Sequence, residues 1–218
     1  MNRMITVRGT GTISVKPDLT VLNMNLDTRH TEYSKCMKLA NKEIEALRDA
    51  FEKIGFEHDS LKTTDFRIAA EYKRHKDTSG NYHELFDVWS CRHDLKLEFP
   101  LDADRLSEVL TCIAKCETHP KFKVKFSIAD KNSICEELLK NATENAKRKA
   151  EILCESSGVT LGEIVNINYN WGEVKLFSDT EYDDDFLTDR ICSTPVSIHI
   201  DPEEIKNSDS VTLVWSIA

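Results

Sequence analysis

The chain has 218 residues, of which 40% are hydrophobic and 31% charged, a composition typical of folded globular proteins and unlike that of disordered chains. Its 29 basic and 38 acidic residues give a net charge of −9. This charge argues against general binding to nucleic acids or to anionic lipid surfaces, because both need a clustered excess of Lys and Arg.

The chain opens with two segments of alternating polarity. Residues 4–15 and 19–28 have the period-2 pattern of half-buried strands, and Lys-Pro-Asp at positions 16–18 is turn chemistry. So short a connection predicts a long N-terminal hairpin. Gly9 and Gly11 interrupt the first strand, which indicates either a bulge or the close approach of another backbone.

Three later segments have apolar residues at helical spacing. We expect helices at residues 32–54, capped by Thr31 and ended by Gly55, at residues 103–116, capped by Asp102, and at residues 131–157, ended by Gly158.

Strand patterns occupy most of the remaining chain. They cover residues 61–72, 82–99, 121–128 and 164–169, and a closing pair at 192–200 and 210–217. Segment 178–185 is acidic and has no period. We interpret it as a solvated loop, since it lacks the glycine and the closing glutamate of a calcium-binding EF-hand loop.

Together these elements predict an α+β fold. We expect a mainly antiparallel sheet with the long N-terminal hairpin, three helices packed on it and the closing C-terminal strand pair. The organisation is a single domain over residues 1–218, with two α+β lobes at about 1–99 and 100–218 as the alternative. No run of about 18 apolar residues occurs, so we expect no membrane insertion.

The cysteines bear on the cellular compartment. An odd number in a long chain, without a closely spaced framework, is typical of reduced and buried thiols. The seven are Cys36, Cys91, Cys112, Cys116, Cys135, Cys154 and Cys192. Met1 leads directly into strand pattern without an apolar signal core, so we expect a cytoplasmic protein, or a periplasmic one if a leader precedes Met1.

One cluster of residues has metal-ligand chemistry. Cys112 and Cys116 are one helical turn apart, and His119 follows three residues later. Two thiolates and an imidazole are a possible start of a zinc site, or of a reactive thiol pair, but no fourth ligand is evident. The alternative is that both cysteines pack inward before a solvent-exposed histidine.

Gly9 and Gly11 lack the third glycine and the following helix of a nucleotide fingerprint. We therefore expect no catalytic residues and no cofactor.

The order and spacing of several motifs resemble the SIMPL-domain family. The opening Gly-x-Gly strand with its Pro-Asp turn, the Ala- and Lys-rich helix with its Gly-Val-x-Leu-Gly exit, and the closing strands carry the resemblance. The residues are Val7, Gly9, Gly11, Val15, Pro17, Asp18, Ala142, Ala146, Lys149, Ala150, Glu151, Gly158, Val159, Leu161, Gly162, Pro202, Glu203, Glu204, Ile205, Val211, Thr212 and Leu213.

The resemblance implies a bacterial protein of unknown biochemical activity. The family includes periplasmic proteins linked to oxidative-stress defence, outer-membrane-associated immunogenic proteins and an animal signalling adaptor. Its members resemble α+β subunits that assemble into ring- or channel-like oligomers, and the family implies no catalytic residue set.

Three hypotheses for the function remain open. The first is a non-enzymatic, homo-oligomeric scaffold or stress-related accessory protein, which assembles by strand addition at exposed edges of both terminal strands. The second is a thiol- or metal-dependent stress protein that uses Cys112, Cys116 and His119. The third is a protein with a pocket for a small ligand.

Overall fold

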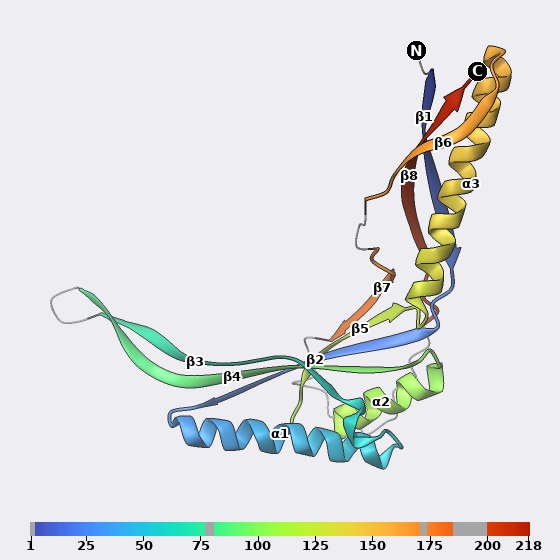
Figure 1. Cartoon of the computed structure of the whole chain (residues 1–218). Helices are drawn as coiled ribbons and strands as arrows, with labels where there is room; N and C mark the ends of the chain where they lie inside the picture. The colour runs from blue at the N-terminus through green and yellow to red at the C-terminus, as the bar shows by residue number, and fades with distance from the viewer. Residues whose placement is uncertain (1–2, 77–80, 171–173, 185–199) are drawn as a thin grey trace. The chain divides into compact units, whose positions relative to one another are not determined.

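The computed structural model describes residues 3–76, 81–170, 174–184 and 200–218 (Figure 1). These residues form three α-helices, a short 3₁₀ helix at His58–Ser60 and eight strands in two sheets. The fold is therefore α+β, as the sequence predicts. The registered pairings β1–β8, β6–β8, β2–β4 and β3–β4 are all antiparallel.

The chain divides into two compact units. Unit 1 consists of Met1–Asp18, Ser127–Asp179 and Pro202–Ala218, and unit 2 consists of Leu19–Phe126 and Thr180–Asp201. The chain thus starts in unit 1, passes through unit 2 and ends in unit 1. Residue 100, near which the alternative two-lobe division was expected, lies inside unit 2, where Pro100 is the last residue of a strand.

Unit 1 is a three-stranded sheet with one helix on it. Its strands are β1 (Met4–Val15), β8 (Ile205–Ile217) and β6 (Leu161–Asn168), in the order β1-β8-β6, and its helix is α3 (Lys131–Ser157). The core between sheet and helix is built from small helix residues and larger strand residues. It contains Val7, Ala142, Ala146, Ala150, Val211, Leu213 and Trp215.

The two glycines of β1 allow α3 to lie directly against the sheet. A Cβ at Gly9 would be 2.0 Å from the carbonyl oxygen of Ala142, and one at Gly11 would be 2.1 Å from the carbonyl oxygen of Leu138. The register of β1 with β8 runs without interruption. Close backbone approach is therefore the correct one of the two expectations for these glycines, and a bulge is not.

Unit 2 contains the larger sheet, with strand order β3-β4-β2-β5-β7. The strands are β2 (Leu19–His30), β3 (Lys62–Lys76), β4 (Tyr82–Pro100), β5 (Lys121–Ser127) and β7 (Phe177–Asp184). The last residue of β5 and the first three residues of β7 are assigned to unit 1. Helices α1 (Tyr33–Lys53) and α2 (Ala103–Lys115) complete the core. Its fully buried members include Leu22, Leu47, Phe51, Leu95, Leu97, Leu106, Ile113 and Phe126.

The expected N-terminal hairpin is wrong. Strand β1 pairs with β8, whereas β2 pairs with β4 in the other sheet. The Lys-Pro-Asp segment does not close a turn because Asp18 is bonded elsewhere. Its amide donates to the carbonyl of Ser127 (3.1 Å), and its carboxylate accepts from the amide of Ala129 (2.7 Å). These bonds direct the chain out of the first sheet instead of back along it.

The helix ends follow the sequence signals at three of the four named positions. Asp102 caps α2 by accepting from the amide of Arg105 (2.7 Å), and Gly55 and Gly158 have positive φ where α1 and α3 end. Thr31 is not the cap of α1. The N-cap is Glu32, whose amide donates to the Nδ1 atom of His30 (2.9 Å).

The acidic segment expected as a loop forms strand β7 over its described part, up to Asp184. Glu181 is ion-paired with Lys123 and, at 3.0 Å, with Lys125, both on β5. These two hydrogen-bonded cations hold the pKa of Glu181 below its usual value. Charge on the neighbouring strand thus compensates for the missing apolar pattern.

The closing strand pair is described only in part. The strand expected at 192–200, with Cys192, lies outside the described residues except for Ile200. The strand expected at 210–217 belongs to β8, which begins earlier, at Ile205.

Candidate functional site

A groove between α1 and α2 contains the two cysteines singled out in the sequence. It has a volume of about 650 Å³ and is lined by both helices, with Ala50, Lys53, Glu108, Cys112 and Lys115 among the lining residues. Cys112 donates a hydrogen bond from Sγ to the carbonyl oxygen of Ala50 (3.3 Å). The thiol therefore ties the two helices together.

The structure does not gather the three predicted metal ligands into a site. The Sγ atom of Cys116 lies 3.1 Å from the Oγ1 atom of Thr118, and His119 lines a different hollow, with Asp27 and Glu43. In the described part of the chain, no three His, Cys, Asp or Glu side chains are arranged to hold a metal ion. The zinc site from Cys112, Cys116 and His119 thus stays a prediction from spacing.

The environment of Cys112 also disfavours a reactive thiol. Burial raises the pKa of this thiol, and the nearby Cys116 and Glu108 raise it further, against the smaller opposing effect of Lys53 and Lys115. Since the thiolate is the nucleophilic form, a raised pKa leaves little of it at neutral pH.

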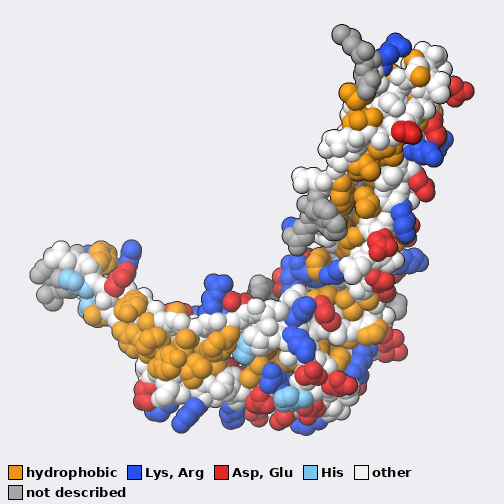
Figure 2. Space-filling view, viewed as in Figure 1, with side chains coloured by type: hydrophobic (Ala, Val, Ile, Leu, Met, Phe, Trp, Pro, Cys, Tyr) orange, Lys and Arg blue, Asp and Glu red, His pale blue; other side chains and the backbone are white. Residues whose placement is uncertain are grey.

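A more prominent surface lies on the long β3–β4 pair. We call residues 70–76 and 82–89 the arm, because here the two strands continue past the first residue of α1 (Figure 1). Hydrophobic side chains are gathered along this pair of strands (Figure 2). On the arm, the side of the sheet that α1 covers further along lacks that cover.

Four rings form a continuous row on this uncovered side. We call Tyr33, Tyr72, Phe86 and Trp89 the aromatic strip. Their centroids are 5.3 Å apart for Tyr33–Trp89, 5.8 Å for Phe86–Trp89 and 6.2 Å for Tyr72–Phe86. Tyr33, Tyr72 and Phe86 are 50%, 59% and 46% exposed. Contiguous exposed apolar side chains of this kind mark interaction surfaces in soluble proteins.

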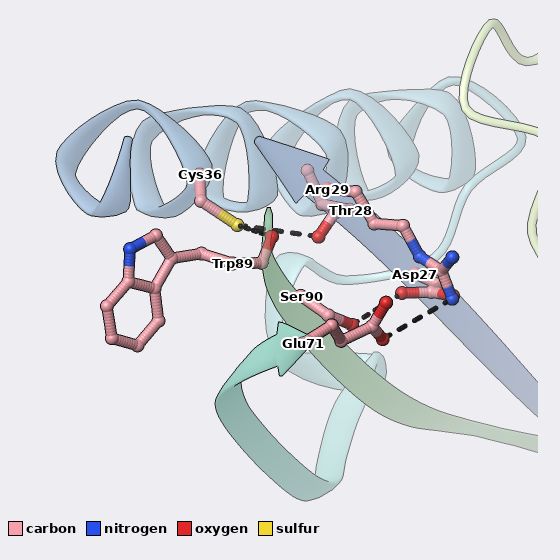
Figure 3. A network of polar contacts seen from close by, with 7 residues as sticks. All are labelled: Asp27, Thr28, Arg29, Cys36, Glu71, Trp89 and Ser90. Atoms are coloured by element: carbon pink, nitrogen blue, oxygen red, sulfur yellow. Dashed lines mark hydrogen bonds and ion pairs between the residues drawn. The ribbon is translucent and has the colours of Figure 1, made fainter. Parts of the chain in front are cut away.

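Polar contacts fix the base of the arm (Figure 3). The buried Cys36 thiol of α1 bonds to the backbone carbonyls of Thr28 (3.4 Å) and Trp89 (3.3 Å). Arg29 pairs with Asp27 (2.9 Å) and with Glu71 (3.5 Å). The start of α1 and three neighbouring strands are thereby joined where the strip begins.

These contacts also change the pKa of Asp27. Burial acts to raise it, but hydrogen bonds from Arg29 and Ser90 and the charges of Arg29 and Arg92 together hold the pKa below its usual value of 3.8. Asp27 thus remains ionised as a fixed partner for Arg29.

Close to the strip, His93 is buried in the sheet. Its Nε2 lies 2.8 Å from the Oγ1 of Thr63, its ring meets Phe66 edge-to-face at 5.0 Å, and its Nδ1 has no hydrogen-bond partner among the described residues. Burial lowers the pKa of His93 below 6.5, and the charge of Arg48 lowers it further against the smaller opposing effect of Asp94.

Unfolding should therefore become easier as the pH falls below about 6.5. Above that pH His93 is neutral in both states, and its contribution to stability is complete. Below it the unfolded chain takes up a proton that the folded chain resists, so stability is lost until the lowered folded pKa is reached. Urea unfolding between pH 8 and 5 should show a smaller pH dependence for His93→Gln than for the wild type. His58→Gln, which changes an exposed histidine, is the control, and an unchanged slope in His93→Gln would contradict the argument.

The strip was not predicted from the sequence, although Tyr72, Phe86 and Trp89 were assigned to strands and Tyr33 to a helix. The strand patterns do not reveal that α1 begins at Tyr33, too late to cover Tyr72 and Phe86. The expectation that both terminal strands have exposed edges holds for one of them only. Strand β1 is an outer strand of its sheet, but β8 lies between β1 and β6 and offers no open edge.

Comparison with known proteins gives a family and distant relatives. The profile of the SIMPL family, described as proteins of unknown function (DUF541), matches residues 5–215. The chain is 23% identical over 164 residues to the 26 kDa periplasmic immunogenic proteins of Brucella melitensis biotype 1 and Brucella abortus strain S19. The match covers 75% of this chain and 65% of each relative, so the chain spans less than two thirds of their length.

These comparisons do not support the cytoplasmic location expected from the sequence, since both relatives are named as periplasmic. Among the helices of the described residues, none has the length and apolar character needed to span a membrane.

Proposed function

Because this chain belongs to the SIMPL family, whose biochemical function is unknown, its own surfaces must indicate its role, and we propose that it is a non-enzymatic assembly module. Its copies associate through strand β3 and the adjoining aromatic strip. The single observation that carries the proposal is the residue pattern of β3, which is complementary to itself.

Strand β3 is an outer strand of its sheet in the described part of the chain. Outer strands leave every second residue's N–H and C=O directed away from the sheet, where they can pair with another strand. From Asp65 to Lys76 every residue of β3 has its own partner residue on β4. The one register shift in this stretch arises because β4 contains an extra residue, Asp87. The free side of β3 is therefore regular enough to accept a partner.

The charges of β3 favour one antiparallel register with a second copy. With a two-fold axis at Ala69, Asp65 faces Lys73 of the other copy and Arg67 faces its Glu71. Opposite charges at facing positions stabilise a strand pair. In the registers two residues away on either side, Asp65 faces Glu71 or Arg67 faces Lys73. Both place like charges together. The first register also sets Lys62 opposite Lys76, but it is the only one of the three that contains opposite-charge pairs, so the pattern favours it.

The other side of the same strand is also complementary. In this register Phe66 faces Tyr72 of the second copy, and Ile68 faces its Ala70. These residues lie on the strip side of the sheet, because the Phe66 ring meets His93 edge-to-face and the Tyr72 ring meets Phe86 in the same way. Pairing thus places Tyr72 of each aromatic strip against Phe66 of the other copy and reduces the apolar surface open to water. A two-fold contact of one patch with itself is the commonest form of protein self-association.

Cellular location is part of the proposal. The relatives are named as periplasmic, and we place this chain in the periplasm on that likeness. A role as a stress-related accessory protein rests on the family resemblance alone and stays a prediction.

Size-exclusion chromatography with light scattering tests the assembly. We expect the mass of a dimer or a larger oligomer, equal with and without reductant. Tyr72→Ser should shift the mass toward the monomer, whereas Ile152→Ser, which removes a similarly exposed apolar side chain from α3, should leave it unchanged. A wild-type monomer at micromolar concentration would refute the proposal.

A further inference from the structure

Near the end of the arm, His75 of β3 and His83 of β4 occupy directly opposite positions. The register is regular from the Tyr72–Phe86 pair to the Lys76–Tyr82 pair, so the two histidines are true cross-strand partners. We propose that they form a binding site for a divalent transition metal ion. The inference is independent of the proposed self-association.

The geometry of an antiparallel pair suits two imidazole ligands. Directly opposite residues project from the same face of the sheet, with Cβ atoms about 4.5–5.5 Å apart. Imidazole nitrogens bind such metals at about 2.0–2.1 Å. Each imidazole ring reaches from its Cβ to a metal ion that lies between the two rings. Both histidines are exposed, so water completes the coordination. A site with two imidazole nitrogens and water oxygens as ligands suits the tetragonal coordination that Cu²⁺ and Ni²⁺ prefer.

The neighbouring charges permit a bound cation. The next pair on the same face is Lys73 with Leu85, and the Lys73 ammonium lies 2.9 Å from the carboxylate of Asp87. On the opposite face, Lys76 lies over the ring of Tyr82, 5.7 Å from its centroid. Arg74, next to His75, is paired across the strands with Glu84 and lies on that opposite face too. The charge of Lys73 is therefore neutralised by Asp87, and Arg74 and Lys76 lie on the face away from the histidines.

Two ligands held together should bind much better than one. Once the first imidazole holds the ion, the second binds within the same molecule at a high effective concentration, which strengthens binding by roughly 100-fold. Loss of either histidine should remove this gain. The cluster around Cys112 is a competing location, and the experiment must separate the two.

Titration of the full-length, untagged chain with Ni²⁺ alone, followed by calorimetry and by NMR of the histidine ring protons, tests the site. We expect one binding event that broadens the ring signals of His75 and His83, and roughly 100-fold weaker binding in both His75→Asn and His83→Asn. His58→Asn, with another exposed histidine replaced, should bind like the wild type. Unchanged binding in the double variant, or broadening confined to other histidines, would overturn the proposal. Circular dichroism confirms that the variants are folded.

Discussion

Gly9→Ala should destabilise unit 1 by about 3 kcal/mol or more, at or above the upper end of the usual cost of overpacking. The added methyl would lie 2.0 Å from the carbonyl oxygen of Ala142 and 2.5 Å from the amide nitrogen of Ala146. Both are main-chain atoms, so no side-chain rotation relieves the clash. Helix α3 would have to move off the sheet, exposing the core residues Val7 and Trp215. Urea unfolding followed by circular dichroism measures the loss.

Two further variants separate this effect from other glycine effects. Gly55→Ala changes a residue with φ of +87° and no atom within 4 Å of the new Cβ, so only backbone strain of about 1–2 kcal/mol is expected. Adding Ala146→Gly to Gly9→Ala should restore little, because the nearest clash is with the backbone of Ala142. A loss in Gly9→Ala no greater than in Gly55→Ala would show that α3 does not press on β1 as described.

Two charge variants should each be monomeric alone but should dimerise when mixed. In Arg67→Glu, both copies carry glutamate at positions 67 and 71, so the β3 pairing opposes like charges twice. In Glu71→Arg both copies carry arginine at these positions, with the same result. One copy of each variant restores two opposite-charge pairs. Light scattering should therefore show monomers for each variant and a heterodimer for the equimolar mixture, with the effect weakening as salt screens the charges.

The mixing design is insensitive to losses within each chain. Arg67 also pairs with Asp65 (2.7 Å) and Glu71 with Arg29 (3.5 Å), and both pairs are altered equally before and after mixing. Lys140→Glu, on the exposed face of α3, is a matched charge reversal that should leave the oligomer intact. A mixture that remains monomeric while the wild type dimerises would exclude the Ala69-centred register.

Local signals in the sequence predicted local structure well. The bounds of α3 coincide with the predicted 131–157, because its apolar period and Gly158 both act within a few residues of the chain. The close approach at Gly9 and Gly11 was one of two stated alternatives. The Asp102 cap of α2 needs only the amide three residues later.

Apart from the cap of α1, the errors concern partners that lie far away in the sequence. The alternation in residues 4–28 identified two strands, but the choice between a hairpin and two sheets depends on bonds of Asp18 to Ser127 and Ala129. The strand character of β7 depends on Lys123 and Lys125, more than 50 residues away from Glu181. Neither interaction leaves a local pattern.

For the candidate surfaces too, the sequence showed local features but not the contacts between distant segments. Cys112 and Cys116 could be placed on one helix face, but not against the Ala50 carbonyl of another helix. The exposure of the aromatic strip depends on where α1 begins relative to the length of β4, which is a property of packing. The self-complementary charges of β3 are visible in the sequence, but they acquire meaning only once β3 is known to be an outer strand.

The position of β8 determines when unit 1 can form during synthesis. Its register joins Met4 to Ser216 and Thr10 to Ser210, so β1 pairs with a strand made about 200 residues later. At about 5–20 residues per second, β1 waits roughly 10–40 s for its neighbour to be translated. The continuous stretch Leu19–Phe126 of unit 2 is complete long before. Unit 1 thus forms only after β8 has been translated, and a chain that stops short of residue 205 lacks its central strand.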